Sequence, residues 1–382
     1  MMDSMTDPVV ALSEHTPMAT LTTLATGGPA RWLARVDTPA GLRAVLEFAR
    51  QRMLPTLAIG SGSNLVVADE GFGGLVLRYM DSTLQYDPRG DGTVRVGAGC
   101  TWDTLVAWAV EHDLAGIECL SGIPGCVGAA PIQNIGAYGQ EIAESIVAID
   151  AIERASGEPA RLAHAECGFG YRTSRFKTDW ADRFLIIRVE LKLRPGGAPH
   201  IRYDELRQRL ESGTDALAPT LRRVRETVIA IRRGKSMVLD PEDPNHRSAG
   251  SFFLNPVVEP RALDAFLARL DAEQRARLPR WPQADGRTKL PAAWLIEHAG
   301  VHRGMVLGHA AVSSRHTLAL VNRGGARTHD LLALAAWIRR RVRVRFGLTL
   351  SPEPVFVGFR ERADVILDEM EATLEPDPGS PR

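Results

Sequence analysis

Residues 121–139 read SGIPGCVGAAPIQNIGAYG, and this stretch is the most informative part of the chain. It holds five glycines and two prolines, too many for a regular helix or strand, yet it is too apolar for a linker. This composition is typical of a buried loop that wraps a ligand. Gln133 and Asn134 could offer amide hydrogen bonds to the ring heteroatoms of a large planar cofactor. A packed irregular crossover explains the same composition equally well.

A second glycine-rich segment, Gly60-Ser61-Gly62-Ser63-Asn64, follows a short apolar run at 57–59. Glycines and small hydroxyl residues after a buried strand can expose several backbone N–H groups in one concave turn, which suits phosphate oxygens. The segment is no dinucleotide-binding fingerprint, because Leu65 stands where a third glycine is needed. Taken alone, it is better read as a tight turn between strands at 57–59 and 65–67, by about two to one.

Apolar periodicity predicts further helices and strands on both sides of these loops. Helices are expected from Thr38-Pro39 to about residue 53, over 101–112, over 219–232, and from Thr328 to Gly347; strands are expected around 93–96, 147–153 and 183–193. The stretch 233–250 reads as a loop and a domain boundary, and the tail 375–382 as disordered. Helix, strand and glycine turn in the first part of the chain suggest a small α/β domain.

Length, composition and charge exclude several classes of protein. The chain has 382 residues, enough for two or three domains at about 150 residues each, and 45% hydrophobic residues are enough for sizeable cores. Lys+Arg and Asp+Glu both total 46, so the net charge of zero argues against a general nucleic-acid binder. No apolar run approaches the roughly 18 residues of a membrane span, and the first twenty residues do not resemble a secretory signal.

Cysteine and histidine usage predicts the compartment and the absence of a metal. Four cysteines without CxxC spacing form no disulfide framework, so a reducing cytoplasm is the expectation. Histidines 302, 309 and 316 have no cysteine or acid pattern around them, so no metal site is expected.

Three short motifs could carry chemistry, although each has a plain structural reading. Arg172 follows Gly170-Tyr171 and could recognise a carboxylate, but in a chain with 42 arginines any one of them is more often a surface cation. Ser251 lies between Gly250 and two phenylalanines without an esterase elbow, so it could be a turn hydroxyl. Glu353 is flanked by Pro352 and Pro354, which equally suits a rigid turn.

Lysine is rare in this chain, and one lysine lies in a phosphate-loop-like triplet. Only Lys177, Lys192, Lys235 and Lys289 are present, so a lysine can mark a position that needs a compact ammonium group. Gly234-Lys235-Ser236 resembles the end of a Walker A loop, but Ile229 occupies the position of its first glycine, so a phosphate-loop NTPase is disfavoured.

Taken together, these segments resemble the UDP-N-acetylenolpyruvoylglucosamine reductase family over about residues 20 to 360. The matching segments, in order, are IGSGSNL, IPGCVGAAPIQNIGAYGQE, ECGFGYRTSRFK, AGSFFLNP, PQADGRTKLPAAWLIE and LSPEPVF. The resemblance implies an α+β protein with an FAD-binding fold of the vanillyl-alcohol-oxidase type and a smaller α+β substrate domain. The expected limits are 20–82 with 347–362 for the first FAD-binding part, 83–237 for the second, 238–346 for the substrate domain, and flexible termini at 1–19 and 363–382.

The resemblance also implies the reaction and its cofactors. NADPH would reduce bound FAD, and the hydride would then reach the enolpyruvyl group of a UDP-sugar in peptidoglycan precursor synthesis. The FAD contacts carried over from the motifs are Gly60, Ser61, Gly62, Ser63, Asn64, Ile123, Pro124, Gly125, Cys126, Val127, Gly128, Gln133, Asn134, Gly136, Ala137 and Tyr138. We expect the substrate UDP-N-acetylglucosamine enolpyruvate, no nucleic acid, no membrane and a monomer.

Catalytic and substrate-binding roles follow from the same matches. Arg172 would hold the substrate carboxylate, Glu353 would assist it in protonated form, and Ser251 would deliver a proton. The expected substrate contacts are Tyr203, Lys235, Asn255 and Lys289, and IRYDEL around Tyr203 points to the subtype with a substrate-covering tyrosine loop. Thr22 stands where the family usually has asparagine, and Leu254 where it often has lysine. A non-enzymatic binder and an oxidase of the same fold are the alternatives.

Overall fold

The computed structural model describes residues 11–212 and 219–374, and these fold into two compact units. Unit 1 comprises 11–16, 30–62, 73–212 and 219–239. Unit 2 comprises 17–29, 63–72 and 240–374. The chain therefore passes from one unit to the other within the second glycine-rich segment, after Gly62.

Unit 1 is built around two sheets. The four-stranded sheet has the order β1 (Ala11–Pro17), β2 (Pro29–Val36), β5 (Phe72–Tyr79), β3 (Thr56–Ala58), with β3 and β5 parallel. The five-stranded antiparallel sheet has the order β12 (Pro159–Ala163), β11 (Ile146–Glu153), β13 (Phe184–Lys192), β7 (Thr93–Gly97), β6 (Leu84–Tyr86). The strands expected around 93–96, 147–153 and 183–193 are thus confirmed as neighbours in one sheet.

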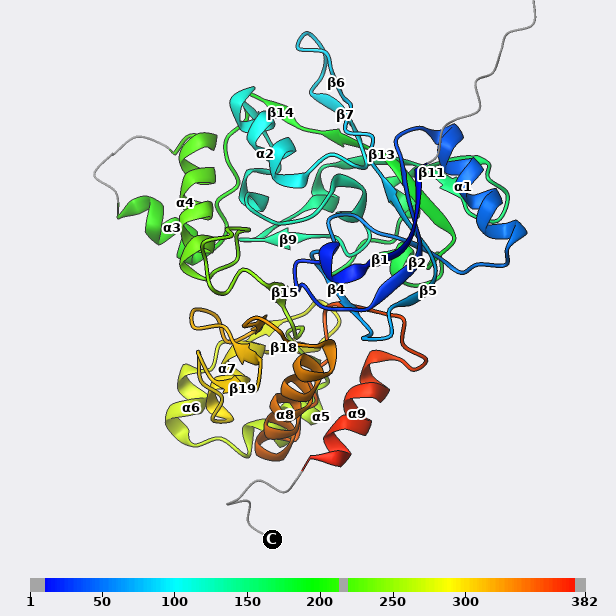
Figure 1. The fold of residues 1–382 in the computed structure, drawn as a ribbon. Coiled ribbons are helices and arrows are strands. Elements are labelled where there is room, and N and C mark those ends of the chain that lie inside the picture. Colours follow the sequence, from blue (N-terminus) through cyan, green and yellow to red (C-terminus); the bar gives the residue numbers. More distant parts are fainter. Residues whose placement is uncertain (1–10, 213–218, 375–382) are drawn as a thin grey trace, which may run out of the picture. The chain divides into compact units, whose positions relative to one another are not determined.

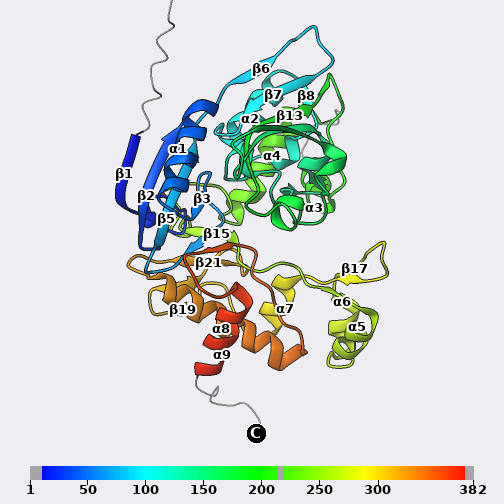
Figure 2. The same cartoon turned by 90° about the vertical axis from the view of Figure 1, so that its right-hand side faces the viewer.

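Helix α1 (Pro39–Gln51) covers one face of the four-stranded sheet (Figure 2). Its first turn is capped as expected, because the Thr38 side chain accepts a hydrogen bond from the Gly41 N–H at 3.1 Å. Its apolar stripe packs with Leu75, Leu77 and Tyr79 of β5. Successive side chains of a strand alternate between faces, so the even-numbered positions of β5 point away from this core.

Further helices and strands complete unit 1 (Figure 1). They are α2 (Trp102–Glu111), β8 (Leu114–Ala115), β9 (Gly136–Ala137), β10 (Gln140–Glu141), β14 (Arg194–Pro195), α3 (Asp204–Glu211) and α4 (Leu221–Gly234). The 121–139 loop is packed rather than exposed, because Val127, Ala130 and Ile135 belong to the core that α2 shares with the five-stranded sheet.

Unit 2 has its own core between helices and small sheets. One sheet has the order β15 (Ser248–Ser251), β21 (Ala319–Asn322), β20 (Ala310–Val312), β19 (Val306–Leu307); another has the order β16 (Val257–Val258), β18 (Thr288–Lys289), β17 (Trp281–Pro282). Strands β4 (Leu65–Val67) and β22 (Val355–Val357) pair in parallel. The helices are α5 (Pro260–Leu267), α6 (Ala272–Arg277), α7 (Ala292–His298), α8 (Thr328–Phe346) and α9 (Ala363–Thr373).

Two expectations need correction. Residues 363–373 form helix α9 rather than a flexible end, and it packs beside α8 (Figure 1), where Arg339 donates to Asp368 at 2.9 Å. Residues 11–17 are likewise ordered, as strand β1. The ends 1–10 and 375–382 lie outside the described residues.

The glycine-rich turn does not join two neighbouring strands. Strand β3 before the turn pairs with β5, whereas β4 after it pairs with β22, more than 280 residues further along the chain. The interpretation as a simple strand–strand turn in one small α/β domain is therefore wrong, because the two strands that flank it belong to different sheets.

The general class and the last long helix are as expected. The structure is α+β, with mainly antiparallel sheets, and α8 begins at Thr328 and ends before Gly347, whose φ of 71° is the left-handed conformation typical of a helix C-terminus. No helix within residues 11–212 and 219–374 is long and apolar enough to cross a membrane.

Candidate active site

The two glycine-rich segments meet within unit 1. A Cβ atom placed on Gly60 would lie 3.4 Å from the Cβ and Sγ atoms of Cys126 and 3.6 Å from the Cβ atom of Ala129. Gly128 approaches the end of β7 so closely that a Cβ atom there would lie 2.5 Å from that of Ala98. Glycine is thus required for this approach, and the predicted phosphate turn lies against the predicted cofactor loop.

The turn also leaves one polar atom to be explained. The Ser61 hydroxyl oxygen is buried beside the Cys126 thiol and makes no hydrogen bond of full geometry within residues 11–212 and 219–374. Buried hydroxyl groups in proteins are almost always hydrogen-bonded. Gly62, with a φ of 67°, turns the backbone here. A hydroxyl and backbone N–H groups gathered in one turn fit an anionic group such as the pyrophosphate of FAD.

Arg172 is held at the tip of a tight turn in unit 1. Gly170 and Thr173 exchange two backbone hydrogen bonds, at 3.1 and 3.2 Å, and Arg172 has a left-handed φ of 52°. Its guanidinium group donates to the backbone oxygens of Asn134, at 3.3 Å, and Gly136. These bonds fix the guanidinium group beside the 121–139 loop, so the structure brings together two motifs that are about 40 residues apart in sequence.

Asn134 ties the same two segments together from inside. Its side chain donates to the Glu141 carboxylate at 2.7 Å and to the Gly170 carbonyl at 3.0 Å, and it accepts from the Ala143 N–H at 3.1 Å. The residue is fully buried. The Asn134 side chain therefore holds the 121–139 loop to the segment around Gly170. The sequence predicts only a cofactor contact for this residue.

Replacing Asn134 with alanine should lower the free energy of unfolding by about 3 kcal/mol, because three buried partners lose their hydrogen bonds. Asn134 also has a left-handed φ of 47°. The N134G variant loses the same bonds without strain and should be destabilised slightly less than N134A. Denaturant unfolding of both variants measures this, and a loss below about 1 kcal/mol in each would contradict the assignment.

Tyr138 and Arg232 form a half-buried pair beside Arg172. Burial raises the pKa of the Tyr138 phenol to about 12. Burial also lowers the pKa of Arg232, against the opposing effects of Tyr138 and Asp103, and the charge of Arg172 adds to the lowering. The Nε atom of Arg232 has no hydrogen-bond partner among the described residues. Two arginines therefore concentrate positive charge beside the loop, which suits an anionic substrate.

The predicted substrate residues of unit 1 lie around the start of α3. Tyr203 directly precedes α3, is 43% exposed, and meets the Tyr138 ring edge-on at 5.5 Å between centroids. Lys235, which directly follows α4, donates to the Glu205 carboxylate at 2.7 Å. Because Gly234-Lys235-Ser236 follows a helix instead of preceding one, it cannot act as a phosphate loop.

In unit 2, the backbone brings Ser251 and Glu353 close to each other. Phe253 forms an antiparallel bridge with Pro352, and Phe252 accepts from the Glu353 N–H at 2.9 Å. Gly250, with a φ of 74°, precedes Ser251 at the end of β15. Neither side chain is fully buried. The hydroxyl and the carboxyl group are thus carried on two adjoining segments.

Asn64 lies next to Glu353, because β4 pairs with β22. Its side chain donates to the Glu353 carbonyl oxygen at 3.5 Å, and its own carbonyl accepts from the Val355 N–H at 2.9 Å. The last residue of the glycine-rich turn is therefore linked directly to a predicted catalytic residue.

Asn255 and Lys289 lie on adjoining segments of unit 2. The Asn255 side chain accepts from the Ala292 N–H at 2.9 Å, at the first residue of α7. The Lys289 ammonium lies 5.6 Å from the centre of the Trp281 ring. Of the two departures, Thr22 is nearly buried and its hydroxyl donates to the Thr26 carbonyl at 3.3 Å, whereas Leu254 is linked through its N–H to the Ser351 carbonyl at 3.0 Å.

Sequence reasoning missed the charged partners of the site. Nothing in the sequence distinguishes Arg232 from the 41 other arginines. Nothing in the sequence identifies Glu205 as the partner of Lys235 either. The helical periodicity of α4 gives a weak indication that Arg232 is shielded from solvent, because Arg232 lies four residues after the buried Val228 and so on the same face of the helix.

Two family models and several known proteins are similar to this chain. A family model described as UDP-N-acetylenolpyruvoylglucosamine reductase, C-terminal domain, matches residues 242–357, and one described as FAD binding domain matches residues 30–163. UDP-N-acetylenolpyruvoylglucosamine reductases from Thermobifida fusca and Streptomyces avermitilis are 45% and 46% identical, over 91% and 90% of this chain and 98% and 94% of theirs. The crystal structure of such a reductase (MurB) from Thermus caldophilus has a TM-score of 0.61 at 28% identity, and covers 91% of this chain and 98% of that one.

Proposed function

The chain belongs to the UDP-N-acetylenolpyruvoylglucosamine reductase family, and we propose that Arg172, Ser251 and Glu353 are its catalytic residues. The enzyme is an FAD-dependent oxidoreductase that uses NADPH to reduce UDP-N-acetylglucosamine enolpyruvate to UDP-N-acetylmuramate, in peptidoglycan precursor synthesis. The observation that carries this function is the 45% identity over nearly the full length of both chains. Its FAD-binding fold is likewise that of the family.

The substrate poses an electrostatic problem. An enol ether accepts a hydride only if its carboxylate can absorb the developing negative charge. The chemistry that FAD supplies when bound is the transfer of a hydride from NADPH to the vinyl carbon. We propose that Arg172 binds and polarises the carboxylate through its planar guanidinium group, and that Glu353 assists. The two carbonyl oxygens that hold Arg172 support this role, because they fix the direction of its remaining N–H groups.

The second half of the addition needs a proton. Ser251 donates its hydroxyl proton to the carbon next to the carboxylate, so that the C=C double bond becomes a single bond with one hydride and one proton added. A serine hydroxyl is a weak acid, and it can act here only because the enolate-like species is strongly basic. The adjoining position of Glu353 supports a route by which the serine could be reprotonated.

Cofactor and substrate contacts follow the motifs. Residues 60–64 and 123–138 are proposed to bind FAD, in keeping with the buried Ser61 hydroxyl, which makes no hydrogen bond of full geometry within the described residues. Tyr203, Lys235, Asn255 and Lys289 are proposed to bind the UDP-sugar. A monomeric enzyme in the cytoplasm remains our proposal, as do the domain limits 20–82 with 347–362, 83–237 and 238–346.

The direct test of the function is NADPH oxidation by the purified protein with and without the enolpyruvyl sugar. We expect oxidation that depends on the sugar and yields UDP-N-acetylmuramate. Oxidation that needs only oxygen would indicate an oxidase, and flavin binding without turnover a binding protein.

Replacing Lys235 with arginine should raise the KM for the enolpyruvyl sugar about tenfold, although the charge is kept. The compact ammonium group already bonds Glu205 at 2.7 Å, and a planar fork would move that partner. Steady-state kinetics measures the effect, with K192R at the end of β13 as the control. An unchanged KM in K235R would refute a substrate-binding role for this lysine.

A further inference from the structure

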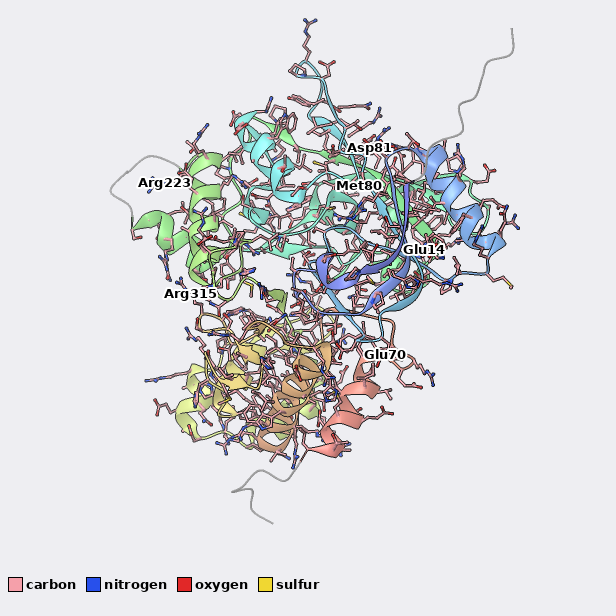
Figure 3. The ribbon with its side chains drawn as sticks, viewed as in Figure 1. Glu14, Glu70, Met80, Asp81, Arg223 and Arg315 are labelled. Atoms are coloured by element: carbon pink, nitrogen blue, oxygen red, sulfur yellow. The ribbon has the colours of Figure 1, made fainter. Side chains whose placement is uncertain are left out.

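Arg78 is a positively charged residue of unit 1 that has no role in the proposed reaction. It is the next-to-last residue of β5, just before Met80 and Asp81, which are labelled in Figure 3. It is half-buried. Within residues 11–212 and 219–374 it has no hydrogen bond and no ion pair. A half-buried guanidinium group without an anionic partner needs an explanation, because desolvation of a charge is unfavourable.

The alternation of β5 determines the direction of this side chain. Leu75, Leu77 and Tyr79 belong to the core beneath α1. Burial raises the pKa of the Tyr79 phenol to about 12, as expected for a side chain facing that core. Arg78 has the opposite parity and therefore points to the other face of the sheet.

The glycine-rich turn follows the strand that pairs with β5. Strand β3, which leads into the turn, pairs with β5 in the register Ala58 with Leu77, and the Ile59 N–H donates to the Leu77 carbonyl at 2.9 Å. Arg78 is therefore level with the first residues of the turn. Burial raises the pKa of the Cys126 thiol, and the charge of Arg78 is near enough to oppose the increase. Gly60 touches the same cysteine, with 3.4 Å between its Cβ position and the Sγ atom.

We propose that Arg78 binds the pyrophosphate of FAD, together with the Ser61 hydroxyl and the backbone of the Gly60–Gly62 turn. Two independent observations meet at one place within the described residues: a buried hydroxyl beside the Cys126 thiol that makes no hydrogen bond of full geometry, and a guanidinium group without an anion. A pyrophosphate supplies acceptor oxygens and negative charge to both at once. The inference rests on FAD as the cofactor, and it concerns a residue outside the family segments quoted above.

The test is FAD binding by the full-length apoprotein, measured by quenching of flavin fluorescence. We expect R78M to raise the Kd for FAD at least tenfold and R78K to raise it less. The Kd for riboflavin, which has the ring system but no phosphate, should change less than twofold in R78M. R43M is the matched control, because Arg43 is an exposed arginine on α1, over the opposite face of the sheet, and its FAD affinity should equal that of the wild type.

Each remaining outcome overturns the proposal. An FAD Kd in R78M within twofold of the wild type would mean that Arg78 does not contact the cofactor. Equal losses for FAD and riboflavin in an R78M protein that melts at the wild-type temperature would mean that Arg78 does not act on the phosphates. If R78M melts at a lower temperature, the same comparison of FAD with riboflavin is made with R78K, the gentler variant. A higher KM for the UDP-sugar with unchanged FAD affinity would assign Arg78 to the substrate. Absence of FAD binding by the wild type would instead overturn the cofactor itself.

Discussion

Replacing Arg172 with methionine should lower kcat/KM for the enolpyruvyl sugar about a thousandfold, or about 4 kcal/mol. The guanidinium group is held by two backbone carbonyls of the 121–139 loop, so it is already positioned before the substrate reacts. A positive charge fixed in advance stabilises the charge that develops on the substrate carboxylate. Lysine at this position keeps the charge but loses the planar fork, so kcat/KM of R172K should lie between the values for the wild type and R172M.

The two half-reactions separate this role from a structural one. Reduction of the enzyme-bound flavin by NADPH should proceed in R172M at the wild-type rate, whereas reoxidation by the sugar should slow. R175M is the control, because Arg175 lies three residues further along, is half-buried like Arg172, and directs its guanidinium group to Asp179 at 3.0 Å and over the Trp180 ring. Wild-type reoxidation in R172M would remove Arg172 from the mechanism.

Replacing Ser251 with alanine should slow product formation by about 10² to 10⁴-fold, the range for loss of a general acid. The hydride could still reach the vinyl carbon, but the adjacent carbon would lack its proton donor. Cysteine carries a hydrogen that can be donated, so S251C should recover part of the rate. Product formation in single turnovers measures the effect.

Ser351 supplies the control for this substitution. It lies two residues before Glu353, its carbonyl rather than its side chain bonds Leu254, and it is exposed. S351A should therefore turn over as the wild type does. If S251A reduced the sugar at the wild-type rate, a different proton donor would have to be found.

Elements fixed by local chemistry could be predicted from the sequence. The helix start at Thr38 and the helix end at Gly347 follow from residues that satisfy or terminate a helix within one turn. Long-range pairings could not be predicted. Nothing near Leu65–Val67 reveals that its partner strand is Val355–Val357. For this reason the sequence favours a simple turn between two neighbouring strands, which is wrong.

Helix α9 shows a second limit of the same kind. Its sequence is charged and ends the chain, features that also suit a flexible tail. It is ordered by residues far away in sequence: Leu367 is fully buried in the core of unit 2, and the nearly buried Arg339 of α8 donates to Asp368.

In the candidate site, too, some residues could be predicted from local motifs and others could not. The motifs named Arg172 and Asn134, but their mutual contact depends on the folded loop. Arg78 and Arg232 could not be distinguished from the other arginines, because burial and missing partners are properties of the fold. The structure therefore adds most to the prediction of which charged residues lie in the site.

The most direct test of the central claim is the absorbance spectrum of the purified protein, followed without oxygen as NADPH and then the enolpyruvyl sugar are added. We expect flavin bands that bleach with NADPH and return when the sugar is added, with UDP-N-acetylmuramate as the product. A protein without flavin bands, even after reconstitution with FAD, would contradict both cofactor and mechanism. Flavin that bleaches but is not reoxidised by the sugar would contradict the substrate.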